Sequence, residues 1–186
     1  MGEIPISPEE SAKIASDYLG SPEKFRDPFS SREGTIYHFL WGGKPSYILK
    51  EIKPDSQPFK KLGKKAEEVA AGMQAVYDLA KKYFGDELVP MSFIPGKNDA
   101  GEESVLVIHP EIVGPTLEEL AQTEGEATQF ERFLTLDSFQ RTWEEMKRDR
   151  DWKKLPRHVR HYFSACDIFG TGVVKTENGE LRIIDF

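Results

Sequence analysis

The sequence predicts an α+β fold in which an antiparallel sheet with one long helix precedes a mainly helical region. Two β-rich runs, residues 35–41 and 46–52, are joined by Gly-Gly-Lys-Pro at 42–45, a connection typical of a hairpin. Residues 58–84 then carry apolar side chains at alternating spacings of four and three, which predicts one continuous amphipathic helix closed by Gly85. The chain has 186 residues, enough for one domain or two small lobes.

The remaining elements of the first half follow from local signals. A helix should begin at Ser7, a good N-cap with Pro8 in its first turn, and end at Gly20. Residues 88–94 are expected to form an edge strand because they contain a proline. A turn over 95–101 should lead into a strand over 104–108.

The second half begins with a Pro- and Gly-containing linker at 110–115. Thr116 and Glu119 have the spacing of a capping box, so a helix should start there. A helical stretch should cover about 128–164, broken near Pro156. A short hairpin, 172–175 and 180–184, is expected to end the chain, with its turn at Glu-Asn-Gly.

Composition excludes several classes of protein. The 25 Lys and Arg against 32 Asp and Glu give a net charge of −7, which argues against sequence-independent binding to nucleic acid. No apolar run has the length of a membrane span, and the N-terminus lacks the features of a secretory signal. A lone Cys166 excludes an internal disulfide and a cysteine-based zinc site. We expect a soluble, cytoplasmic protein.

Basic residues gather in one segment, 141–161, which carries eight bases against four acids. Such a segment suits an anionic ligand or partner. The alternative is a solvated helix face on which charges pair at a spacing of three or four.

The order of short motifs along the chain resembles the protein-kinase-like fold, including its aminoglycoside-phosphotransferase relatives. The motifs that carry the resemblance are Gly34-Thr35-Ile36-Tyr37, Tyr47-Ile48-Leu49-Lys50, the strand and linker at 106–111, the helix start at 114–120, Asp167, and Ile183-Ile184-Asp185-Phe186. The resemblance implies a five-stranded antiparallel N-lobe with one long helix over 1–108, a hinge at 109–115 and a reduced, mainly helical C-lobe over 116–186. It places a nucleotide between the lobes.

The resemblance also implies a role for individual residues. Lys50 would contact the α- and β-phosphates of ATP, oriented by a glutamate on the long helix, for which we choose Glu68. Asp185 would bind Mg²⁺, and Asp167 would accept the proton of the attacking hydroxyl or orient that hydroxyl. Taken on their own, Lys50 also fits a surface lysine on a strand, and Asp185 fits a capping residue at a strand end.

Further nucleotide contacts are expected from backbone positions. Gly34 matches the last glycine of the family's glycine-rich loop, whereas Phe29 and Ser31 stand at its two earlier glycine positions. The edge of the adenine would meet the backbone of the segment His109 to Ile112, which includes Glu111.

The functional hypothesis is therefore an ATP-dependent phosphotransferase that moves the γ-phosphoryl group to a hydroxyl acceptor of unknown identity. The rival is a pseudokinase-like module that regulates a protein partner. Gly172 favours the rival, because it stands where the family carries a metal-binding Asn, and so does Cys166 in the motif before Asp167. A third alternative is an unrelated α+β interaction domain that is indifferent to ATP.

Overall fold

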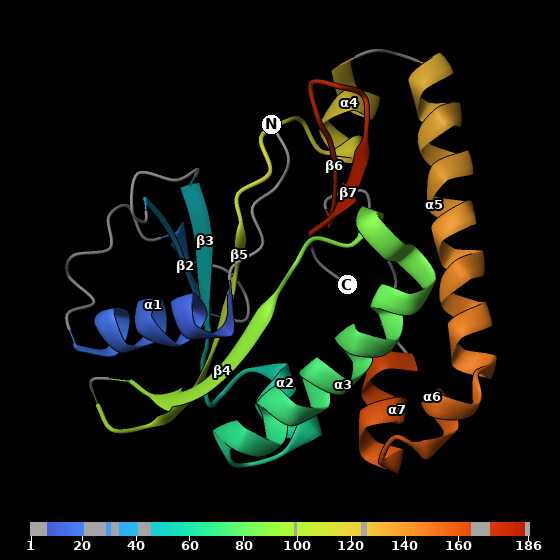
Figure 1. Cartoon of the computed structure of the whole chain (residues 1–186). Helices are drawn as coiled ribbons and strands as arrows, with labels where there is room; N and C mark the ends of the chain where they lie inside the picture. The colour runs from blue at the N-terminus through green and yellow to red at the C-terminus, as the bar shows by residue number, and fades with distance from the viewer. Residues whose placement is uncertain are drawn as a thin grey trace. The chain divides into compact units, whose positions relative to one another are not determined.

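The computed structural model describes residues 7–20, 29–30, 34–40, 46–98, 100–123, 126–164 and 172–184. The chain forms an α+β structure that divides into two compact units (Figure 1). The first unit comprises residues 1–75 and 90–111, and the second comprises 76–89 and 112–186. Helix α3 (Ala66–Phe84) runs from the first unit into the second.

The first unit is built on an antiparallel sheet, which confirms the predicted hairpin and sheet type. In the described residues the sheet has five strands in the order β1-β2-β3-β5-β4. The strand bounds are β1 (Phe29–Ser30), β2 (Gly34–Leu40), β3 (Ser46–Ile52), β4 (Ser92–Lys97) and β5 (Glu103–Pro110). The predicted connection at 42–45 lies outside the described residues.

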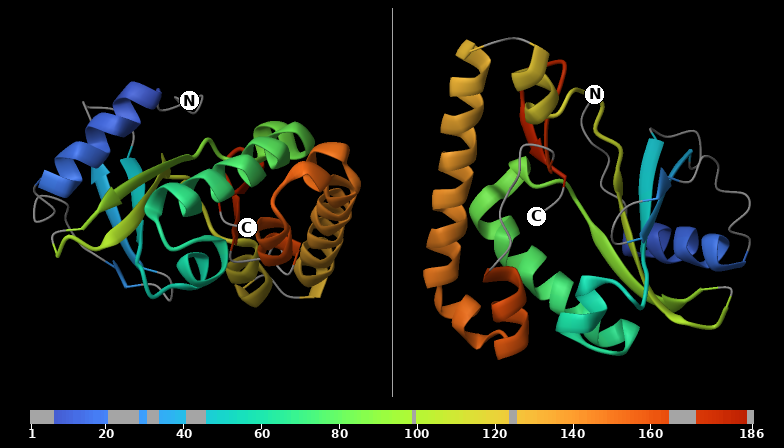
Figure 2. Two further views of the ribbon diagram at one scale, coloured as in Figure 1. Left: turned by 90° about the horizontal axis from the view of Figure 1, so that it is seen from below. Right: turned by 180° about the vertical axis from the view of Figure 1, so that it is seen from behind.

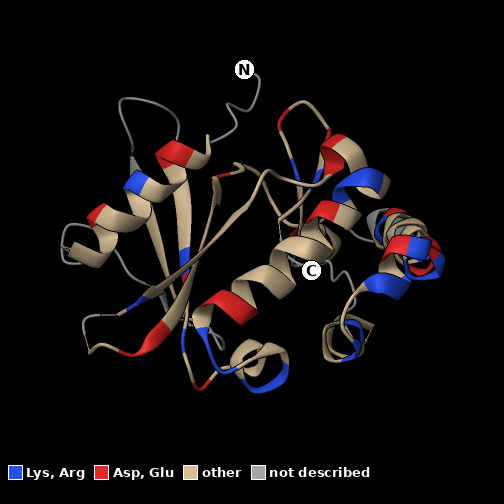
Figure 3. Ribbon diagram, turned by 60° about the horizontal axis from the view of Figure 1, so that its bottom comes forward, with Lys and Arg blue, Asp and Glu red and all other residues tan. Residues whose placement is uncertain are grey.

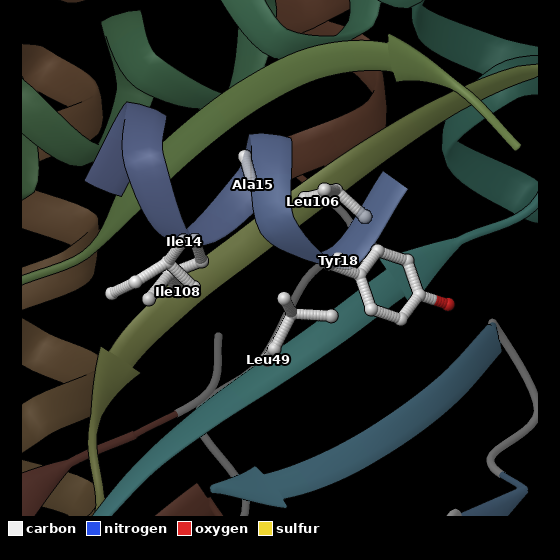
Figure 4. Packing of buried hydrophobic residues seen from close by; sticks show 6 residues of the cluster. All are labelled: Ile14, Ala15, Tyr18, Leu49, Leu106 and Ile108. Atoms are coloured by element: carbon white, nitrogen blue, oxygen red, sulfur yellow. The ribbon is translucent and has the colours of Figure 1, made fainter. Parts of the chain in front are cut away.

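Helix α1 (Pro8–Gly20) covers one face of this sheet, and its predicted ends are confirmed. The Ser7 hydroxyl accepts a hydrogen bond from the Glu10 amide, and the Glu10 carboxylate accepts one from the Ser7 amide, both at 3.1 Å. This reciprocal pair satisfies two amides that have no partner within the helix. Figure 4 shows the buried cluster between helix and sheet: Ile14, Ala15, Tyr18, Leu49, Leu106 and Ile108.

The prediction of one helix over 58–84 is wrong in its first turns. The structure has a short helix α2 (Gln57–Leu62), a break, and then α3. An ideal Cβ on Gly63 would lie 2.6 Å from the Cβ of Glu68, so the break depends on a residue without a side chain. Glu68 reaches back to the amides of Lys64 and Lys65, at 3.1 and 3.4 Å, and caps the start of α3.

The strand predicted at 88–94 also differs. The edge strand β4 begins only at Ser92 and continues to Lys97, so the turn is shorter than expected. Leu88 instead forms an isolated parallel bridge with Ile183, and the Val89 amide donates to the Ile183 carbonyl at 3.1 Å. The apolar character of residues 88–89 therefore reflects pairing in the second unit.

The second unit combines helices with a small hairpin, as the two views of Figure 2 show. The Thr116–Glu119 capping box is confirmed, with hydrogen bonds of 2.7 to 3.2 Å, and the end hairpin is confirmed with a left-handed Gly179 in its turn. The elements are the 3-10 turn η2 (Gly85–Glu87), α4 (Leu117–Thr123), α5 (Glu126–Arg148), α6 (Arg150–Lys154), α7 (Arg157–Ser164), β6 (Val173–Lys175) and β7 (Leu181–Ile183).

The long helical stretch is broken near Pro156 as predicted, and once more at Asp149. The Asp149 side chain accepts from the Asp151 amide and caps α6. Trp143, with a 1% exposed side chain, packs against Phe84 and Trp152 in the core of this unit. Among the described residues, no helix combines the length and apolar character needed to cross a bilayer.

Candidate functional site

Lys50 lies at the centre of the sheet in the first unit. Its strand β3 pairs with β2 on one side and β5 on the other, so the direct neighbours of Lys50 are Ile36 and Val107. Residues paired in antiparallel strands project from the same face of a sheet. The next residue along this row, Phe93 of β4, is paired with Val107 and shares that face.

The surface around Lys50 is aliphatic. Ile48 and Ile52 precede and follow Lys50 at the spacing of two that keeps side chains on one face. Ile52 and Val105 are paired and fully buried, and Val107 is buried as well. Lys50 as a residue is half-buried within this aliphatic row, although Lys is among the residues least often buried.

Polar side chains occur at the end of this face where β5 ends. His38, Ile48 and His109 form the next row of paired residues. The Nδ1 of His38 lies 3.1 Å from Oε1 of Glu111, and the buried His109 ring lies 2.9 Å from the Pro110 carbonyl through its Nδ1. The structure thus brings Lys50, His109 and Glu111 onto one side of the sheet.

Two backbone positions after His109 have no amide hydrogen free to bind a ligand. The Glu111 amide donates to the Ser46 carbonyl at 2.9 Å, and Pro110 has no amide hydrogen. Ile112 is the first residue beyond these two. Gly34, at the start of β2, is paired with Ile52 and so belongs to the row next to Lys50.

Glu68 occupies the first turn of α3, where its Oε2 accepts the two backbone hydrogen bonds given above. The side chain is exposed. The pairing of Glu68 with Lys50 stays a prediction, and the capping contacts give Glu68 a structural role of its own.

Sequence reasoning missed a buried polar cluster on the opposite face of the sheet. Glu51 is only 6% exposed, and the Tyr18 hydroxyl donates to its Oε2 at 3.0 Å. The same hydroxyl lies 3.1 Å from that of Tyr37. Burial, followed by the hydrogen bond to Tyr37 and the charge of Glu51, raises the pKa of Tyr18 far above its usual value. The strand's period of two was the available signal, since it places Glu51 with Tyr47 and Leu49.

The end hairpin of the second unit is held at both sides of β7. The Ile184 amide donates to the Gly172 carbonyl at 2.8 Å, and the Ile183 carbonyl accepts from Val89. These contacts fix the point from which the chain continues to Asp185. Asp185 itself and Asp167, which follows the end of α7 by three residues, lie outside the described residues.

The described residues do not form a cluster of side chains that could bind a metal ion. Within them, no three His, Cys, Asp or Glu side chains converge as metal ligands would. Gly172 contributes no side chain, and its carbonyl already accepts a hydrogen bond. The assignment of Mg²⁺ therefore depends on Asp185.

Three of the eight basic residues in the segment 141–161 form ion pairs with other described residues. Ion pairs join Arg141 to Asp137 and Lys147 to Glu144 within α5. In α6, Lys154 lies 2.8 Å from Asp151, which also lies 2.9 Å from Lys82. Hydrogen bonds from Lys154 and Lys82 lower the pKa of Asp151 to about 2. Such pairs at a spacing of three or four are expected of a solvated helix face. Figure 3 marks the acidic and basic residues on the ribbon.

Comparison of the sequence with protein-family models and with curated proteins finds no match.

Proposed function

We propose that the chain is a nucleotide-binding domain of the protein-kinase-like type that transfers the γ-phosphoryl group of ATP to a hydroxyl acceptor. The observation that carries this proposal is the position of Lys50, a cation in the aliphatic row Ile36, Lys50, Val107 of a central strand. A planar base can pack on an aliphatic sheet face, and an ammonium group on that face donates hydrogen bonds to phosphate oxygens.

The sequence of elements supports the proposal. The hairpin β2–β3 is followed by a helical segment, α2 and α3, and then by β4 and β5. A linker leads from β5 into a helical unit that ends in a hairpin just before Asp185. This is the order that the resemblance implies for the lysine, the hinge and the metal-binding loop.

The proposed chemistry is a phosphoryl transfer in which the protein supplies position and charge. The bond between the γ-phosphorus and the oxygen that bridges to the β-phosphate breaks, and ADP leaves with that oxygen. A new bond forms between the γ-phosphorus and the acceptor oxygen, whose proton passes to the carboxylate of Asp167. Lys50 would hold the α- and β-phosphates, and Asp185 would hold the Mg²⁺, which would supply positive charge to the phosphates.

The backbone hydrogen bonds at the end of β5 limit which amide is available to bind the adenine. The Glu111 amide is hydrogen-bonded to the Ser46 carbonyl, and Pro110 has no amide hydrogen. We therefore assign the Ile112 amide as the group that donates a hydrogen bond to the adenine. His109 and Glu111 would flank the base through side chains on the Lys50 side of the sheet.

The test is equilibrium binding of a fluorescent ATP analogue with Mg²⁺ to the intact chain. Lys50→Met should weaken binding at least tenfold, because it removes a charge-assisted contact to phosphate. Lys53→Met is the matched control: Lys53 is exposed and lies just after the end of the same strand. Equal affinity of the two variants would contradict the proposed site.

A pseudokinase-like module is the second candidate, and Gly172 favours it. This residue offers no side-chain ligand where the family carries Asn, so a second metal ligand is missing. Asp167→Asn separates the two functions. In an enzyme it abolishes ATP turnover while nucleotide binding remains, whereas in the pseudokinase-like module the unaltered chain already binds without turnover.

A further inference from the structure

A cavity of about 310 Å³ lies wholly within the second unit, where α4, α5 and the end hairpin meet. Its apolar wall comes from four leucines, and two cationic side chains lie beside them. These lining residues are Leu117, Leu120, Arg132, Leu134, Lys175 and Leu181. The volume falls in the range of small-molecule sites. None of these residues belongs to the proposed nucleotide site.

The β6–β7 hairpin, which forms one wall of this cavity, is held by backbone pairing and by hydrogen bonds in its turn. Lys175 and Leu181 are directly paired across the hairpin, so both side chains project from the same face. The turn that joins them is closed by hydrogen bonds between Thr176 and Glu180 and by one from Gly179 to Thr176, all between 2.9 and 3.2 Å. The backbone positions of Lys175 and Leu181 are therefore fixed relative to each other.

The two cations differ in their partners. Arg132 forms an ion pair with Glu118, so its charge is already balanced. The Lys175 side chain has no hydrogen bond or ion pair with any residue in the described part of the chain. Its ammonium group, set against leucine side chains, is a donor that suits an anion.

Uncovered apolar surface continues from the cavity along α5. Leu134 is 49% exposed although it lines the cavity, and Phe130 and Phe133 are each 62% exposed. These three side chains are spaced three and four apart, so they share one helix face. A ligand with an apolar body would cover this surface while its head group meets Lys175.

We propose that this cavity binds a small amphiphilic carboxylate, with its head group on Lys175 and its apolar chain against Leu117, Leu120 and Leu134. The site is independent of the nucleotide site. Glu131 also lines the cavity, and its negative charge repels an anion. The two charges should therefore affect the affinity for a carboxylate in opposite directions. Removing the charge of Lys175 should weaken binding, and removing that of Glu131 should strengthen it.

The test is isothermal titration of the intact chain with butyrate, hexanoate and octanoate. Affinity should rise about fourfold for each methylene that becomes buried and then level off when the cavity is filled. Octan-1-ol, which has the same chain without the charge, should bind at least tenfold more weakly than octanoate. Affinity that rises without a limit, or equal binding of the alcohol, would overturn the proposal as non-specific adsorption.

Variants locate the site. Lys175→Gln should weaken octanoate binding about tenfold, Glu131→Gln should strengthen it a few-fold, and the exposed Lys153→Gln serves as the matched control without effect. Leu134→Glu, at a half-exposed position that tolerates a polar side chain, should abolish binding without unfolding the chain. Lys50→Met should leave octanoate binding intact, so failure here and failure of the nucleotide site are distinguishable. Equal affinity of the Lys175 and Lys153 variants, or no saturable binding of octanoate, would refute the assignment.

Discussion

Replacing Gly114 by alanine should destabilise the second unit, because the linker passes directly against β6 at this residue. An ideal Cβ on Gly114 would lie 2.1 Å from the carbonyl oxygen of Lys175, a backbone atom. The φ angle of Gly114 is +154°, which side-chain-bearing residues rarely adopt. The adjacent hydrogen bond from the Lys175 amide to the Pro115 carbonyl, at 3.0 Å, would have to lengthen.

The magnitude follows from the two costs. Overpacking costs about 1–3 kcal/mol and a strained backbone conformation a similar amount, so we expect a loss of about 3 kcal/mol. In a chain of this length that corresponds to a decrease of about 6–12 °C in Tm. The assay is thermal unfolding followed by circular dichroism, together with hydrogen exchange of the Lys175 amide, which should lose protection.

Two control glycines separate the contributions. Gly101 has a φ of +76° but open space around its Cβ, so Gly101→Ala should carry the conformational cost alone. Gly20, at the end of α1, has neither feature, so Gly20→Ala should leave Tm nearly unchanged. The reasoning is refuted if Gly114→Ala melts within a degree of Gly20→Ala.

Two further predictions concern polar contacts within each unit. Tyr18→Phe should lower the free energy of unfolding by about 1–3 kcal/mol in urea denaturation, because the buried Glu51 carboxylate loses its donor. Asp151→Asn should remove a pH-dependent contribution, because Lys154 and Lys82 hold the folded-state pKa of Asp151 at about 2, below its ordinary 3.8. The lowered pKa means that folding favours the ionised form of Asp151. The unaltered chain should therefore have a higher free energy of unfolding than Asp151→Asn above about pH 4, and this difference should shrink as the pH falls towards 2.

Each of these has its own control. Tyr37→Phe keeps the contact between Tyr18 and Glu51 and should cost less than Tyr18→Phe. Asp55 is exposed in the turn after β3, so Asp55→Asn is a suitable comparison and should leave the free energy of unfolding nearly unchanged. A Tyr37 variant as unstable as the Tyr18 variant, or a constant Asp151 difference down to pH 2, would contradict the respective argument.

The elements that were predictable from sequence are those set by local chemistry. Ser7 with Glu10, and Thr116 with Glu119, satisfy helix-end amides within a single turn, so their spacing alone indicates the helix start. Gly179 in the end hairpin is a comparable case, because a left-handed turn residue is a local requirement.

Features set by distant residues were not predictable. The break at Gly63 depends on the close approach of Glu68, which a continuous apolar stripe conceals. Leu88 looked like part of a strand in the first unit but pairs with Ile183, 95 residues later in the chain. The contact between Tyr18 and Glu51 likewise needs the packing of α1 on the sheet before it can be seen.

The residues of the candidate site also divide into those whose positions the local sequence predicts and those whose contacts it does not. Alternation in β3 was sufficient to place Lys50 on the face opposite Leu49, and the paired strands then supply its aliphatic neighbours. The capping contacts of Glu68 were not expected, because the sequence predicted no helix start at Lys65. The roles of Asp167 and Asp185 come from the resemblance and stay predictions.

The central claim is that the chain binds Mg²⁺-ATP through Lys50 and Asp185, and thermal unfolding with and without this ligand tests it most directly. At a ligand concentration about 100 times Kd, the stabilisation is about 2.7 kcal/mol, or about 5–11 °C in Tm. We predict this rise for the unaltered chain and for Lys53→Met, and its loss in Lys50→Met and Asp185→Asn. No rise at millimolar nucleotide, or an equal rise in the Lys50 variant, would contradict the account.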